Sequence, residues 1–129
     1  MIDFHSREFV QALHNEQLRL HGGAAGLRDE GALESALSRP VNRQAYSDPD
    51  ICDLAAAYLY GIVRNHPFVD GNKRTGFAAA DLFLYFNGLS LEAAQEDVIQ
   101  LVTMVAAGEI DEAGAAAFFR DFTVKLEGE

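Results

Sequence analysis

The residues of this sequence whose types and spacing could support chemistry lie between positions 66 and 74, which read HPFVDGNKR. Imidazole side chains can take up a proton near neutral pH, so His66 could accept a proton from an attacking hydroxyl. Asp70 supplies a carboxylate of the kind that binds Mg²⁺ together with phosphate oxygens. Lys73 and Arg74 supply positive charge, and the guanidinium of Arg74 can hold two oxygens. Phosphoryl transfer needs these parts, because it depends on positioning and charge stabilisation.

The backbone around Gly71 and Asn72 is predicted to complete this site. Both residues precede a long apolar segment, which we expect to be a helix with unsatisfied N–H groups at its start. Such a helix start binds anions, and Gly71 gives a phosphate room to approach. Arg64 adds a third cation, so three of the ten basic residues fall within eleven positions of a chain with net charge −10. Phe68 is expected to bury its ring and anchor the loop.

Each of these residues also has an ordinary structural interpretation. Taken alone, His66 is typical of a helix end, Asp70 of a helix cap and Lys73 of a solvated surface. His66 and Asp70 could instead bind a transition metal, but the sequence has no HExxH pattern and no cysteine pair. His14 and His21 are expected to be surface histidines. Only the combination of residues favours catalysis.

Apolar residues recur at helical spacing along the sequence, and the two-residue alternation of strands is nearly absent. We therefore expect one all-α domain over residues 1–129, a compact bundle of about six helices around a buried central helix. The expected helices are 6–21, a short helix between Asp29 and Pro40, 51–65, 76–86, 92–107 and 111–126. Segment 22–31 is expected to be a loop or flap, and 41–50 an irregular connection. Helix 76–86 has Asp81 as its one charged residue, so it is predicted to be the central helix.

The overall charge and composition exclude several classes of protein. With 20 acidic and 10 basic residues, the chain is poorly suited to binding nucleic acid or an anionic membrane. Met1–His5 lacks the basic start of a signal peptide, and no apolar stretch reaches membrane-spanning length, so we expect a cytoplasmic protein. The single cysteine, Cys52, is expected to be a small buried apolar residue.

Segment 66–75 resembles the signature of the Fic/Doc family, H-x-F-x-(D/E)-(G/A)-N-x-R, and segment 26–40 is similar to the early part of its death-on-curing toxins. The resemblance covers nearly the whole chain and implies a six-helix fold. It further implies that segment 22–31 is a flap that holds the target protein. The roles that it implies are those of general base for His66, magnesium-associated carboxylate for Asp70, anion hole for Gly71 and Asn72, and phosphate binding for Arg74.

Lys73 departs from most family members that transfer AMP, which have glycine at this position. Death-on-curing toxins have lysine there, and the resemblance implies protein kinases that use the γ-phosphate of ATP. Their known target type is a threonine of elongation factor Tu, whose phosphorylation halts translation. Gly71, by contrast, is typical of the members that transfer AMP. AMP transfer therefore remains an alternative, and an inactive binding module that keeps the fold is a third.

The resemblance also implies partners and cofactors. We expect ATP as substrate, Mg²⁺ as cofactor and an antitoxin of the Phd type, whose C-terminal segment would fold as a helix over the active-site groove. Residues 123–128 fit the family's self-inhibitory pattern, (S/T)-x-x-x-E-(G/N), through Thr123, Glu127 and Gly128. This pattern is short enough to arise by chance.

Overall fold

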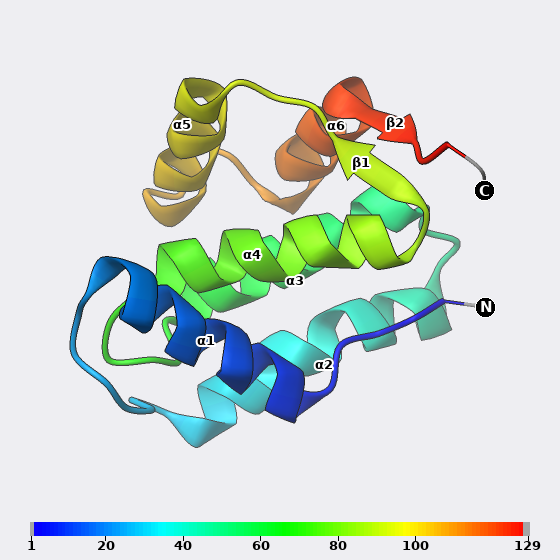
Figure 1. The fold of residues 1–129 in the computed structure, drawn as a ribbon. Helices are drawn as coiled ribbons and strands as arrows, with labels where there is room; N and C mark the ends of the chain where they lie inside the picture. Colours follow the sequence, from blue (N-terminus) through cyan, green and yellow to red (C-terminus); the bar gives the residue numbers. More distant parts are fainter. Residues whose placement is uncertain (1, 128–129) are drawn as a thin grey trace.

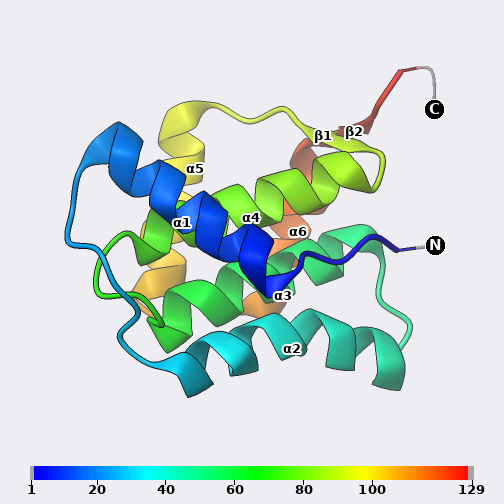
Figure 2. The same ribbon diagram turned by 60° about the horizontal axis from the view of Figure 1, so that its bottom comes forward.

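In the computed structural model, which describes residues 2–127, side-chain caps mark the start of four of the six helices. Ser6, Asp29, Asp50 and Asp111 each accept a hydrogen bond from a backbone N–H in the first turn of the helix that follows. The helices are α1 (Arg7–His21), α2 (Glu30–Tyr46), α3 (Ile51–Asn65), α4 (Asn72–Phe86), α5 (Gln95–Ala106) and α6 (Glu112–Phe122). They form the predicted helical bundle (Figures 1 and 2).

Helix α3, and not α4, is the central helix of the bundle. It packs against α2, α4, α5 and α6, and ten of its fifteen residues are buried. Its small residues allow close approach, since a Cβ on Gly61 would lie 3.2 Å from the backbone of Ala36 in α2. Helix α4 instead leaves Tyr85 and Phe86 exposed. The prediction that 76–86 is central is therefore wrong, because apolar composition does not show how much of a helix its neighbours cover.

Helix α2 continues past Pro40 to Tyr46, so the prediction that Pro40 ends this helix is wrong. A proline inside a helix costs about 3 kcal/mol, because it removes one backbone hydrogen bond and crowds the preceding turn. Here the ring is buried, and the following turn is held by an ion pair between Arg43 and Glu112 of α6, at 2.6 Å. Tertiary contacts thus offset the cost, and only residues 47–50 form the connection to α3.

The end of the chain folds differently from the prediction. Strand β2 (Thr123–Lys125) follows α6 at once and pairs antiparallel with β1 (Leu89–Leu91), with Ser90 opposite Val124. Three-residue strands show too little alternation to be predicted from sequence. The self-inhibitory pattern therefore begins in a strand and not in a helix, while Gly128 lies outside the described residues.

The other helix predictions are close to the structure. Helix α1 begins one residue later than expected, at Arg7, and it buries Val10 but leaves Leu20 exposed. Helix α5 begins at Gln95, three residues later than expected, because the preceding residues lead out of β1. Cys52 is buried, as predicted. In the described part of the chain, no helix has the length and hydrophobicity needed to cross a bilayer.

Candidate active site at the start of helix α4

The loop that joins α3 to α4 begins with His66 in the left-handed conformation, with φ 55° and ψ 53°. It is the only non-glycine residue with positive φ in residues 2–127. Its backbone N–H donates to the carbonyl oxygen of Ile62 and closes α3, while its side chain is exposed. Between residues 2 and 127 the imidazole has no hydrogen-bond partner, so it is available to a substrate.

Phe68 and Asn72 fix the middle of this loop. Phe68 is buried, which confirms its predicted role as an anchor. The Asn72 side chain is 4% exposed, and its Oδ1 accepts from the Phe68 N–H while its Nδ2 donates to the Phe68 carbonyl, both at 2.9 Å. These bonds occupy the amide group of Asn72. Its backbone N–H is therefore the part of this residue that can meet an anion.

His14 is a site residue that the sequence analysis missed. The expectation of a surface position is wrong, because the side chain is only 3% exposed, whereas His21 is exposed as expected. The ring stacks on Phe68 with 3.8 Å between centroids and 8° between planes. Its Nε2 lies 2.8 Å from the carbonyl oxygen of Asp70. The available signal was its position four residues after Val10, on the inward face of α1.

The glycine-rich segment between α1 and α2 runs antiparallel to the motif loop. The Val69 N–H donates to the Gly26 carbonyl at 3.0 Å, and the Arg28 N–H donates to the Pro67 carbonyl at 2.7 Å. The Arg28 guanidinium also donates to the His66 carbonyl at 2.5 Å. These bonds hold the predicted flap against the loop. The role of Arg28 was also missed, because a basic residue in a glycine-rich segment gives no sign of its partner.

Asp70 joins the flap to the start of α4. Its carboxylate accepts from the Ala24 N–H at 3.2 Å and from the Gly71 N–H at 2.8 Å. These two bonds, led by the one from Ala24, lower the pKa of the Asp70 carboxyl below its usual value, and the charge of Arg74 acts in the same direction. The group is therefore ionised at neutral pH. Gly23 leaves the space that this contact needs, since a Cβ there would lie 2.8 Å from Oδ2.

The oxygen atoms of Asp70 fit a magnesium site better than a transition-metal site. No group of three or more His, Cys, Asp or Glu residues that could hold a metal occurs among residues 2–127, which gives the transition-metal interpretation of His66 and Asp70 no support. Mg²⁺ commonly uses one or two carboxylates plus phosphate oxygens and water. Each oxygen of Asp70 accepts one hydrogen bond and keeps a free lone pair. Asp70 therefore fits Mg²⁺ held together with a bound phosphate.

Helix α4 begins without a side-chain cap, unlike α1, α2, α3 and α6. Gly71 precedes it with φ 80° and ψ 16°, a conformation that favours glycine. In the described part of the chain, the backbone N–H groups of Asn72, Lys73 and Arg74 have no acceptor, and the exposed side chains of Lys73 and Arg74 form no ion pair. Unsatisfied donors and two cations at the positive end of a helix make a site suited to an anion.

The Arg64 side chain is bonded to the end of α5. Its Nη1 donates to the carbonyl oxygen of Ala106 at the end of α5, at 2.9 Å. The role of Arg64 in phosphate binding stays a prediction.

Comparisons with known proteins agree with the motif and the geometry. The model of the Fic/DOC family matches residues 4–84. The chain belongs to the Fic/DOC family. It is 35% identical to "Protein kinase doc" of Escherichia phage P1 over 116 residues, which cover 89% of this chain and 91% of that protein. It is 43% identical to "Toxin Doc" of Mycolicibacterium smegmatis over 113 residues, which cover 82% and 85% of the two chains.

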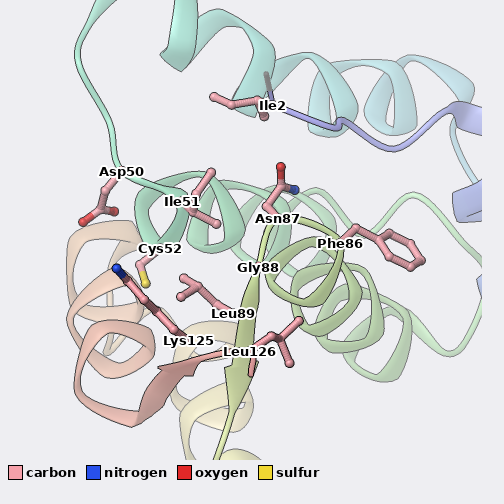
Figure 3. A pocket seen from close by; sticks show the side chains of 10 residues that line it. All are labelled: Ile2, Asp50, Ile51, Cys52, Phe86, Asn87, Gly88, Leu89, Lys125 and Leu126. Atoms are coloured by element: carbon pink, nitrogen blue, oxygen red, sulfur yellow. The ribbon is translucent and has the colours of Figure 1, made fainter. Parts of the chain in front are cut away.

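This Fic/DOC protein also has a cavity of about 770 Å³ at the other end of α4 (Figure 3). Apart from the exposed Lys125, the polar side chains that line it are bonded within the protein. Asp50 accepts from Arg120 at 2.8 Å, and the Cys52 thiol lies 3.7 Å from the Thr123 hydroxyl. Burial raises the pKa of Cys52, which keeps the thiol protonated and unreactive. None of the predicted site residues lines this cavity.

Proposed function

We propose that this protein is a toxin of a toxin–antitoxin system that acts as a protein kinase and moves the γ-phosphate of ATP to a serine or threonine hydroxyl. The observation that carries the proposal is the uncapped start of α4, where Lys73 and Arg74 form no ion pair within residues 2–127 and the loop before them exposes His66. The names of the two relatives, a protein kinase and a toxin, support the same activity.

Each residue has a role in this reaction. The Nε2 or Nδ1 atom of His66 accepts the proton of the target hydroxyl. The hydroxyl oxygen attacks the γ-phosphorus, and the bond from that phosphorus to the departing ADP breaks. The N–H groups at the start of α4 and the Arg74 guanidinium hold the phosphate oxygens. Mg²⁺, when bound at Asp70, would neutralise phosphate charge. The donors are fixed before substrate binds, so they stabilise the transition state without reorganisation.

Lys73 favours transfer of the terminal phosphate over transfer of AMP. Its long side chain occupies space that an α-phosphate would need but can pair with a γ-phosphate, which extends further from the nucleotide. Gly71 is the feature that favours AMP transfer, but its positive φ already accounts for a glycine at this position. We therefore retain AMP transfer as the second candidate.

The proposed target is elongation factor Tu, and the proposed regulator is an antitoxin of the Phd type that covers the active-site groove. Both follow from the family resemblance. A reaction with purified elongation factor Tu separates the candidates, using ATP labelled at either the γ or the α position. Label transferred from the γ position alone supports the kinase, whereas label from the α position alone contradicts it.

Two variants serve as controls for this reaction. His66→Ala should abolish transfer, and Lys125→Ala, which removes an exposed cation at the other end of the molecule, should leave it unchanged. Equal toxicity of His66→Ala and the wild type in growing cells would instead support the inactive binding module.

A further inference from the structure

We propose that His14 is a positioning residue that fixes the peptide bond between Asp70 and Gly71 in the orientation needed for phosphate binding. The inference rests on the proposed function, because it concerns the same anion site. It begins from the two contacts of the buried ring, the stack on Phe68 and the 2.8 Å contact between Nε2 and the Asp70 carbonyl oxygen.

The direction of this hydrogen bond follows from chemistry. A carbonyl oxygen only accepts, so the Nε2 atom of His14 carries the proton and donates it. In residues 2–127, no other donor contacts the Asp70 carbonyl oxygen. His14 is therefore the one donor that holds this carbonyl group in the described residues.

The orientation of the carbonyl also fixes the N–H on the other side of the same peptide. The chain has no cis peptide in its described part, and in a trans peptide the C=O and N–H groups point in opposite directions. With the carbonyl turned towards His14, the Gly71 N–H is turned away from it and donates to Asp70 Oδ1 at 2.8 Å. One bond from α1 thus also sets the geometry of the Asp70 carboxylate.

Without the imidazole donor, only the bond from the Gly71 N–H to Asp70 Oδ1 would oppose rotation of this peptide. Gly71 has no side chain and tolerates both signs of φ. Rotation would place the carbonyl oxygen beside the Asp70 carboxylate, break the bond to Oδ1 and bring a partial negative charge towards the phosphate site. The ring of His14 also closes the far side of the turn, since a Cβ on Gly71 would lie 3.6 Å from its Cδ2.

Two substitutions separate the donor from the stacked ring. His14→Phe keeps a flat ring against Phe68 but removes the N–H, whereas His14→Gln keeps an N–H donor but loses the ring. We expect His14→Phe to lower kcat/KM for ATP at least tenfold, because small displacements in an active site cost this much or more. We expect its melting temperature to stay near that of the wild type. His14→Gln should be less stable but recover activity to within a few-fold, and His21→Phe, an exposed histidine of the same helix, should match the wild type.

Hydrogen exchange of the Gly71 amide gives a readout that is independent of activity. The exchange rate should rise at least tenfold in His14→Phe and remain near the wild-type value in His14→Gln. If His14→Phe does not fold, His14→Leu is the second variant without a donor. The inference is overturned if the donor-free variants keep full activity and slow exchange, or if activity follows melting temperature. If the wild type itself transfers no phosphate while Gly71 exchange changes as expected, the proposed function fails and the positioning role stands.

Discussion

The two ends of α4 differ in how their polar groups are satisfied. At the start of the helix, Asn72, Lys73 and Arg74 present N–H groups and charges that have no partner in the described part of the chain. At the far end, the Asn87 side chain bonds to the Asp3 backbone and to the Phe83 carbonyl, and the helix is closed by its own backbone. Figure 1 shows these ends on opposite sides of the molecule, with the loop into α4 at the left and the C-terminal strand at the right.

This difference shows that unpaired N–H donors and cations, and not the volume of a cavity, mark the candidate site. The cavity of about 770 Å³ lies at the end where the polar side chains, apart from the exposed Lys125, are paired. At the motif end the loop is held by hydrogen bonds from His14, Arg28 and Asn72, while Lys73 and Arg74 form no ion pair in the described residues. A rigid frame around unpaired donors is what binding and stabilising a phosphate requires.

Removal of His66 should have the largest effect on activity. His66→Ala is expected to lower the rate of phosphate transfer by about a thousandfold, within the range for loss of a general base. The melting temperature should be unchanged, because the side chain is exposed and unbonded. Steady-state kinetics and calorimetry measure the two quantities. Loss of folding in this variant would make the residue structural instead.

The two asparagines at opposite ends of α4 provide a matched test of stability. Asn72→Ala leaves the buried N–H and carbonyl of Phe68 without partners and should reduce the free energy of unfolding by about 3 kcal/mol. Asn87→Ala should cost about 1 kcal/mol, because its side chain is half exposed and water can replace the lost bonds. Urea denaturation measures both values. Equal losses would contradict the view that the motif loop is the more tightly held end.

The shape of the Arg74 cation should matter as well as its charge. Arg74→Lys keeps the charge but loses the planar guanidinium, so kcat/KM for ATP should fall about tenfold. Arg120→Lys makes the same exchange in α6, away from the site, and should leave kcat/KM for ATP unaltered. Similar losses in the two variants would show that Arg74 acts through overall stability.

The smallest expected effect is a pH dependence that arises from His5. Burial lowers the pKa of its imidazole below the usual 6.5, even though Nε2 contacts the Ala79 carbonyl. The folded state therefore binds fewer protons than the unfolded state near this pKa. The contribution of His5 to the free energy of unfolding is fully present above pH 6.5 and is lost as the pH falls towards the lowered pKa of the folded state. His5→Phe should flatten the stability curve between pH 7 and the folded pKa. An unchanged curve would contradict the assignment.

The sequence predicts most of the helices and the position of the candidate site, because both depend on local features. The cap Asp50, the helical spacing of the apolar residues in α3 and the residues around Gly71 can each be recognised within a short segment of sequence. The errors concern contacts between distant segments. The helical Pro40 depends on packing and on Glu112 of α6, and the role of His14 depends on a carbonyl 56 residues away.

The most direct test of the contrast between the two ends is a titration of the labelled protein with ATP and Mg²⁺, followed by the amide resonances in NMR spectra. We predict that the largest shifts occur at Asn72, Lys73 and Arg74, and that they disappear in Arg74→Ala at the same nucleotide concentration. The amides of Gly88, Leu89 and Leu126, which line the cavity, should not move. Shifts confined to the cavity, with the start of α4 unaffected, would contradict the assignment of the phosphate site.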